Sequence, residues 1–137
     1  MEVYRHKVQY YETDRMGITH HSNYIRWMEE ARVDFLARQG WSYARLEEAG
    51  IVSPVRALDC KYLAPSTFDD DIDIAVSVAE FRGVVLKLRY EMRKQDGKVI
   101  CEAHSEHVFL SAGGGFIRLQ RDYPEFYQLL MRLAQEA

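Results

Sequence analysis

Apolar and polar residues alternate over several stretches of the chain, and this period of two predicts β-strands with one buried face. The first predicted strand covers about eight residues, and its alternating set is Tyr4, His6, Val8 and Tyr10. Three later strands are predicted around the runs 58–62, 72–78 and 84–92, in which every second residue is apolar or aromatic. Such one-sided strands are typical of an antiparallel sheet.

Turn signals divide the C-terminal half of the chain. Asp96-Gly97 predicts a hairpin with a type I′ turn, because these residues tolerate the positive φ angles of that turn. A strand at about 99–110 should follow, then a break at three consecutive glycines and a short strand at 116–119. Asp122 as N-cap and Pro124 in the first turn predict a C-terminal helix.

A period of three to four residues replaces the alternation after residue 21. It predicts a long helix from Ser22 to Gln39 that ends at Gly40, and a short helix over about 42–49 follows it. Apolar residues surround most of the long helix, so we expect it to be buried on more than one side. Glu29 is expected on its apolar side. A sheet with one apolar face and such a helix predict an α+β fold in which the sheet curls around the helix.

Length and charge narrow the class of protein. The chain has 137 residues, which suits a single domain over 1–137, and its formal net charge is 18 − 21 = −3. This mild acidity argues against a nucleic-acid-binding protein. Two distant cysteines, Cys60 and Cys101, form no disulfide framework, and no stretch has the length of a signal peptide or a membrane span. We therefore expect a cytoplasmic location.

The segment between the first strand and the long helix holds the candidate chemistry. Asp14, His20 and His21 lie in a loop at a helix start, where unpaired backbone N–H groups favour an anion or an oxyanion. A carboxylate and two histidines there fit general acid–base or nucleophilic catalysis. The residues alone also allow a plain structural role, with Asp14 capping a turn and the histidines serving as polar loop residues.

This segment resembles a known family. It reads Thr13-Asp14-x-x-Gly17-Ile18-x-x-His21-x-Asn23-Tyr24 and is followed by Trp27-Met28-Glu29-Glu30-Ala31-Arg32. In this it is similar to the hotdog-fold acyl-CoA thioesterases of the 4-hydroxybenzoyl-CoA thioesterase type. The resemblance continues through Tyr62-Leu63-x-Pro65 and Phe68-Asp69-Asp70 and covers nearly the whole chain.

The resemblance implies a hotdog fold, in which a curved antiparallel sheet of five or six strands wraps a long central helix. It implies hydrolysis of an acyl-CoA to a carboxylic acid and free coenzyme A, with Asp14 as nucleophile or general base and His21 as a positioning residue. It implies a homodimer or homotetramer with active sites at the dimer interface, and no metal or cofactor beyond the coenzyme A of the substrate. The predicted substrate-binding residues are Gly17, Ser22, Asn23, Tyr24, Lys61 and Arg118.

Some residues depart from the pattern of this family, and other functions share its fold. Thr19 stands where relatives usually have an aliphatic residue, and Arg15-Met16 also differs, so the acyl group stays open. A non-catalytic acyl-CoA-binding module and an acyl-thioester dehydratase are the alternatives. A metal site at Cys101, His104 and His107 is not expected, because strand alternation points His104 to the opposite face.

Overall fold

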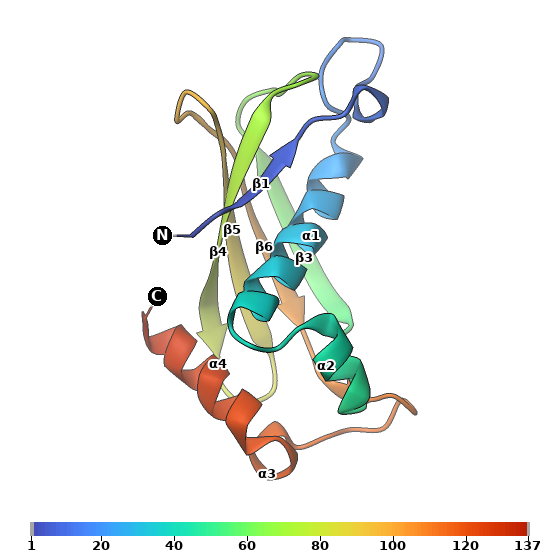
Figure 1. Ribbon diagram of the computed structural model, residues 1–137, viewed down its shortest axis with the longest axis vertical. Coiled ribbons are helices and arrows are strands. Elements are labelled where there is room, and N and C mark those ends of the chain that lie inside the picture. The colour runs from blue at the N-terminus through green and yellow to red at the C-terminus, as the bar shows by residue number, and fades with distance from the viewer. Residues whose placement is uncertain (1, 137) are drawn as a thin grey trace. The chain divides into compact units, whose positions relative to one another are not determined.

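The computed structural model describes residues 2–136 and has an α+β architecture (Figure 1). A five-stranded sheet has the order β1-β4-β5-β6-β3, and β2 pairs with β7 in a second, two-stranded sheet. The strands are β1 (Tyr4–Lys7), β2 (Ile51–Val52), β3 (Val55–Tyr62), β4 (Asp71–Phe81), β5 (Leu86–Lys94), β6 (Val99–His107) and β7 (Leu110–Ser111). The helices are η1 (Tyr10–Glu12, 3₁₀), α1 (Ser22–Arg38), α2 (Tyr43–Glu48), α3 (Leu119–Asp122) and α4 (Pro124–Glu136).

The chain forms two compact units. The first comprises the chain up to Phe35 with Cys60–Val76 and Tyr90–Ala103, and the second comprises Leu36–Asp59, Ser77–Arg89 and the chain from His104 onward. That residues 1–137 make one domain therefore stays a prediction. No helix within residues 2–136 is long and apolar enough to cross a lipid bilayer.

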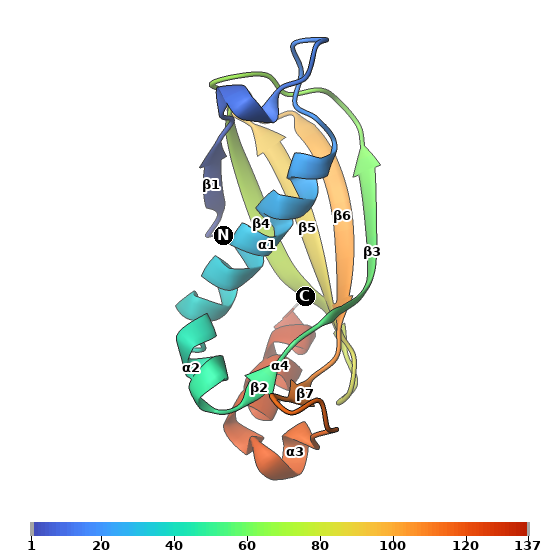
Figure 2. The same ribbon diagram turned by 90° about the vertical axis from the view of Figure 1, so that its right-hand side faces the viewer.

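The core of the first unit forms between α1 and the sheet. The ring of His6 in β1 lies 4.7 Å from that of Trp27, and the Cys60 thiol in β3 donates to the Met28 sulfur at 3.6 Å. The N-terminal half of α1 thus lies between β1 and β3 (Figure 2). Alternate residues of β4 from Ile72 to Val78 are buried, as predicted.

Within the single chain, only one side of helix α1 is buried. The prediction that it is buried on more than one side is therefore wrong for the single chain. Trp27 and Ala31 are fully buried, whereas Ile25 is 42% exposed and Arg26 and Glu29 are exposed. Glu29 therefore does not lie on the apolar side. The sheet covers one face, and the apolar residues elsewhere on the cylinder are too few to make a second.

The second unit packs helices around aromatic residues. Phe126 of α4 lies 4.8 Å from Trp41 and 5.5 Å from Phe109, measured between ring centroids. The guanidinium of Arg45 stacks on Trp41 at 3.7 Å. Ser42 caps α2 by accepting a hydrogen bond from the Arg45 backbone N–H, which confirms the predicted short helix.

Two predicted strands are shorter than expected. The first ends at Lys7, and Tyr10 and Tyr11 lie in η1 with 75% and 78% of their surface exposed. A capping box between Gln9 and Glu12 turns the chain there. Val84 is 71% exposed and precedes β5, which begins at Leu86. Alternation predicts a strand but not the point where its ladder ends.

Strand β3 is exposed along nearly all of its length, so the prediction of one buried face is wrong. It lies at an edge of the five-stranded sheet, where Leu58 is 42% exposed. The sequence shows the alternation of this strand but not its place in the sheet. A long exposed edge strand is a surface on which another strand can pair.

The C-terminal half departs from prediction in three places. The hairpin has positive φ at Gly97 only, so its turn is not type I′. Leu110 lies in β7 after a break in the predicted strand, and Phe116 makes an isolated bridge to it. Asp122 belongs to α3, where its carboxylate accepts from the Arg118 backbone N–H, and so does not cap α4. Pro124 does open α4.

Candidate active site

A tight turn holds Asp14 between η1 and α1. Oδ1 of Asp14 accepts a hydrogen bond of 2.8 Å from the Met16 N–H, and its carbonyl accepts one of 3.0 Å from the Gly17 N–H. Gly17 has φ +80°, a conformation that favours glycine. Asp14 therefore does cap a turn. Its second oxygen, Oδ2, accepts no hydrogen bond within residues 2–136, and Asp14 is not among the residues that line the pocket described below.

Buried Glu12 anchors this turn through its carboxylate. It accepts hydrogen bonds of 2.8 Å from the Gln9 N–H, from His6 Nε2 and from the indole N–H of Trp27. Burial acts to raise the pKa of Glu12, but these three hydrogen bonds outweigh it and hold the pKa below the ordinary value. Glu12 is thus an ionised, fully partnered group that ties η1 to α1.

The backbone carbonyl of Glu12 connects the same turn to the start of α1. It accepts from the His20 N–H at 2.8 Å and from the Asn23 side-chain amide at 2.9 Å. The Asn23 amide also donates to the His20 carbonyl at 3.3 Å. Asn23 is 7% exposed and acts here as a clamp on the loop.

A second loop, after β3, is fastened to the Asp14 turn. The Thr19 N–H donates to the Ser66 carbonyl at 2.8 Å, and the Thr67 hydroxyl donates to the Gly17 carbonyl at 2.7 Å. The Ser66 hydroxyl lies 2.7 Å from that of Thr19 and 2.9 Å from that of Tyr24. These bonds join residues more than forty positions apart and fix the two loops as one wall.

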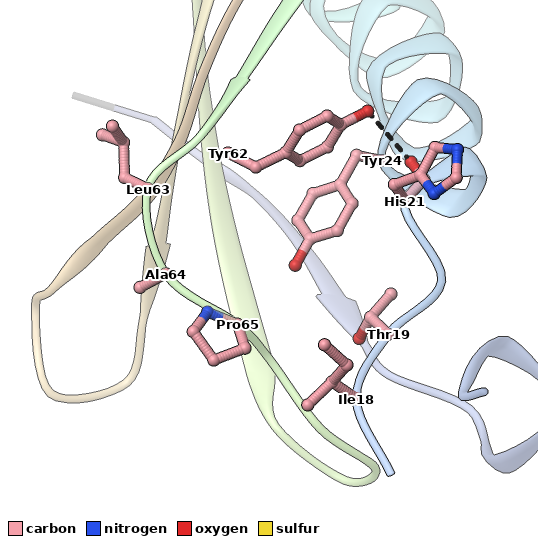
Figure 3. A pocket seen from close by; sticks show the side chains of 8 residues that line it. All are labelled: Ile18, Thr19, His21, Tyr24, Tyr62, Leu63, Ala64 and Pro65. Carbon is pink, nitrogen blue, oxygen red and sulfur yellow. Dashed lines mark hydrogen bonds between the residues drawn. The ribbon is translucent and has the colours of Figure 1, made fainter. Parts of the chain in front are cut away.

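A pocket of about 590 Å³ opens between these loops and the start of α1 (Figure 3). The Tyr62 hydroxyl donates to the His21 backbone carbonyl at 3.2 Å, and the rings of Tyr62 and Tyr24 meet edge to face at 5.2 Å. Burial, with the Cys60 thiol adjacent, raises the pKa of Tyr62 to about 12, so its hydroxyl stays protonated. The lining residues are Ile18, Thr19, His21, Tyr24, Tyr62, Leu63, Ala64 and Pro65.

One backbone donor at the start of α1 remains available. The N–H groups of Asn23 and Tyr24 donate to the carbonyls of His20 and His21, and the Ser22 N–H reaches His20 Nδ1 at 3.3 Å. The N–H of His21 donates to no acceptor in the described part of the chain. His21 also lines the pocket, which makes its N–H a candidate donor for a substrate oxygen.

Comparison with known proteins identifies the family of this chain. The family model described as the thioesterase-like superfamily matches residues 8–130. The chain belongs to the thioesterase-like superfamily. A protein of Aquifex aeolicus named "Putative esterase" is 33% identical over 81% of this chain and 86% of its own length. The acyl-CoA thioester hydrolase YbgC of Escherichia coli is 27% identical over 71% of this chain and 72% of its own.

Solved structures show the same relationship. The DHNA-CoA thioesterase of Staphylococcus aureus superposes with a TM-score of 0.92 at 27% identity, covering 97% of this chain and 90% of that one. The resemblance to hotdog-fold thioesterases and the predicted α+β fold are therefore confirmed. The count of five or six strands holds for the main sheet, and the β2–β7 pair is additional.

The structure brings some of the predicted thioesterase residues together and not others. His21 and Tyr24 line the pocket, and Gly17 and Ser22 lie beside it in the turn and the first turn of α1. Lys61 is exposed in β3 and is not among the lining residues. The remaining predicted residues are Asp14 and Asn23, in the loop network described above, and Arg118, which lies in the second unit.

Sequence reasoning missed three residues of this site. Glu12 adjoins the Thr13-Asp14 motif but shows no sign of burial in the sequence, and Ser66 is one more serine in a loop. Tyr62 appears in the resemblance only as part of a segment, without a role. Their roles depend on contacts with distant residues, so only the folded chain reveals them.

The Cys101, His104 and His107 trio behaves as strand alternation predicts. Cys101 and His107 are buried, whereas His104 is half-buried with Nδ1 3.1 Å from Asp59. No three His, Cys, Asp or Glu side chains gather as a ligand set anywhere in residues 2–136.

Proposed function

We propose that this protein hydrolyses an acyl-CoA thioester to a carboxylic acid and free coenzyme A, with Asp14 as the attacking group or general base. One observation carries the proposal: Asp14 has an uncommitted carboxylate oxygen and is bonded through its N–H to the carbonyl of Ile18, a pocket residue, at 2.9 Å. The names of YbgC and of the Staphylococcus aureus DHNA-CoA thioesterase support the substrate class.

The reaction needs an attacking oxygen and a stabilised oxyanion. As nucleophile, Asp14 attacks the thioester carbon, expels the coenzyme A thiolate and leaves a mixed anhydride, which water then hydrolyses to regenerate the carboxylate. As general base, Asp14 takes a proton from water while that water attacks, and the proton passes to the departing thiolate. The open Oδ2 of Asp14 is compatible with both routes. The thioester already has a good leaving group, so we propose no metal or cofactor.

We assign the oxyanion hole to the N–H of His21. The His21 N–H has no acceptor within residues 2–136 and belongs to a pocket residue just before α1, where the helix dipole adds positive potential. The Tyr62 hydroxyl donates to the carbonyl of His21, which fixes the following peptide unit, between His21 and Ser22, at the start of α1. The ring of His21 is exposed and serves a secondary, positioning role.

We propose that Lys61 and Arg118 contact the phosphates of coenzyme A. Arg118 and Arg82 both line a groove of about 410 Å³ in the second unit, and the guanidinium of Arg82 pairs with Glu80 at 2.7 Å. Lys61 is exposed next to the pocket residue Tyr62. Replacing Arg118 by Gln should raise the KM for acyl-CoA and leave kcat nearly unchanged, because the phosphates do not react.

We propose a homodimer or a homotetramer and a cytoplasmic location. The exposed edge strand β3 supports pairing with a second copy, because its unpaired backbone groups need partners. Light scattering at micromolar concentration should give at least twice the mass of one chain. A monomeric mass would contradict this assembly.

The test of the proposed function is release of free thiol from aromatic, short-chain and long-chain acyl-CoAs. We expect thiol release with at least one class and the matching carboxylic acid as the second product. Binding without thiol release across all classes would indicate an acyl-CoA-binding module. Loss of water from a hydroxyacyl-CoA without thiol release would indicate a dehydratase.

A further inference from the structure

Three sulfur atoms meet in the first unit, where α1 packs on β3 and β6. The Cys60 thiol of β3 donates to the Met28 sulfur of α1 at 3.6 Å, and a hydrogen bond also joins it to the Cys101 thiol in the neighbouring strand β6. Met28 is 2% exposed and Cys101 is fully buried. The hydrolysis proposed above uses none of these three side chains, so the sulfur cluster has no role there.

The backbone holds the two thiols of this sulfur cluster side by side. The Leu63 N–H donates to the Ile100 carbonyl at 2.8 Å, which aligns the end of β3 with the start of β6. The backbone of Lys61 also hydrogen-bonds to the Cys101 sulfur. Such a bond is what orients a ligand atom in a metal site, so the surroundings of Cys101 are already those of a ligand.

The protonation state of Cys101 argues against a redox role for the pair. The hydrogen bond with Cys60, followed by burial, raises the pKa of the Cys101 thiol well above its usual range. A buried, protonated thiol reacts slowly with oxidants, because the thiolate is the reactive form. A metal ion acts differently, since it binds the thiolate and displaces the proton.

The donor set of the sulfur cluster favours a soft cation. Thiolate and thioether sulfurs together are ligands for Cu(I), whereas thioether sulfur is not among the usual ligands of zinc. Three sulfurs in a trigonal plane, each about 2.3 Å from the ion as in zinc–sulfur bonds, lie about 4 Å apart. The distance between the Cys60 and Met28 sulfurs is 3.6 Å, so these atoms need little movement to share one ion.

We propose that Met28, Cys60 and Cys101 form a binding site for a soft monovalent cation of the Cu(I) class. Two S–H bonds break and release two protons, two metal–thiolate bonds form, and the thioether donates a lone pair, with no electron transferred. Cys60 is half-buried in an edge strand, which gives the ion an entry path from solvent. Because one donor is a methionine, this set differs from the His, Cys, Asp and Glu sets excluded above.

The experiment is an anaerobic titration of the full chain with Cu(I), after reduction by a phosphine and with bicinchoninate as the competing chromogenic ligand. We expect the protein to take one Cu(I) per chain from the competitor and, in weakly buffered solution, to release two protons per ion. Cys60 and Cys101 are the only cysteines of the chain, so protection of both from a thiol reagent reports on this site. Failure to take Cu(I), or uptake without proton release, would overturn the proposal.

Variants assign the ligands. Cys60→Ser and Cys101→Ala should each weaken Cu(I) binding at least about a hundredfold, and Met28→Leu at least about tenfold, since a thioether is the weaker donor. Met28→Leu nearly conserves volume, so it keeps the test valid if a cysteine variant does not fold. The matched control is Met131→Leu in α4 of the second unit, and it should bind like wild type.

X-ray absorption at the copper edge counts the sulfur ligands directly. We expect three sulfur neighbours in wild type and two in Met28→Leu. The rings of His20 and His21 are exposed and lie 4.3 Å apart, so they are the competing surface site for copper. Nitrogen neighbours in wild type, or an unchanged affinity in both Cys60→Ser and Met28→Leu, would contradict the sulfur site. Neither readout depends on thioester hydrolysis, so the two proposals fail separately.

Discussion

The indole N–H of Trp27 donates to Oε2 of Glu12 at 2.8 Å, and this bond fixes the start of the Asp14 loop to the N-terminal half of α1. The other oxygen of Glu12 accepts from the Gln9 N–H and from His6. Glu12→Gln should lower the free energy of unfolding at neutral pH by about 1–3 kcal/mol, because an amide cannot accept all three bonds. Urea denaturation measures this loss.

The ionised Glu12 carboxylate that accepts from Trp27 predicts a pH dependence of the free energy of unfolding. The folded state holds the pKa of Glu12 below the ordinary value of 4.5, so its stabilisation is present above that value and is lost as pH falls through the folded pKa. The difference in unfolding free energy between wild type and Glu12→Gln should therefore shrink from pH 6 to pH 3. A difference that stays constant or grows on acidification would contradict the assigned ionisation.

The turn at Gly17 predicts a loss of activity that exceeds its effect on stability. Gly17 has φ +80° and Gly97 has φ +87°, and a Cβ added at either meets no atom within 4 Å. Replacing either by Ala should cost about 1 kcal/mol of unfolding free energy through backbone strain alone. Only Gly17→Ala should also lower kcat, because strain in the backbone at position 17 shifts the N–H that closes the Asp14 turn. Equal activities in the two variants would contradict this role for the turn.

Asp69 predicts a stabilising substitution. It is the only non-glycine residue with positive φ within residues 2–136, at +73°, and its side chain is 68% exposed. Asp69→Gly should raise the free energy of unfolding by about 0.5–1 kcal/mol, despite losing a 3.5 Å surface ion pair to Lys7. Asp71→Asn is the control, because Asp71 also pairs with Lys7 but has no such strain. A lower unfolding free energy for Asp69→Gly than for wild type would contradict the strain.

The sequence predicts the fold well where periodicity decides it. The alternation of Ile72 and its neighbours and the period of α1 identify the main strands and the long helix, and the motif around Asp14 identifies the family. Periodicity does not show where a strand lies within its sheet. The alternation in β3 therefore predicts a buried face, whereas the strand lies at the sheet edge and both of its faces are largely exposed. Periodicity also does not show where the hydrogen bonding between two strands ends. Tyr10 and Val84 are therefore predicted to lie in strands, but both lie outside them.

The sequence predicts those residues of the candidate site that lie close together along the chain. Asp14, Gly17 and His21 fall within one short segment, and their spacing points to a loop before a helix. The bonds from Ser66 to Thr19 and Tyr24 span 47 and 42 residues, and no local pattern signals them. The clamp role of Asn23 also emerges only from the folded chain, because its partners are backbone carbonyls rather than a ligand.

Asp14 is the residue on which the proposed hydrolysis depends most, and turnover of Asp14→Asn on the best acyl-CoA substrate tests this role most directly. Asparagine keeps the oxygen that accepts from the Met16 N–H, so the fold and the oligomeric state should match wild type and must be checked. We predict that kcat falls at least about 10²–10³-fold, since the variant loses the attacking or proton-accepting oxygen. A kcat above about a tenth of wild type, a loss of only about 1.4 kcal/mol, would show that Asp14 does not carry the reaction.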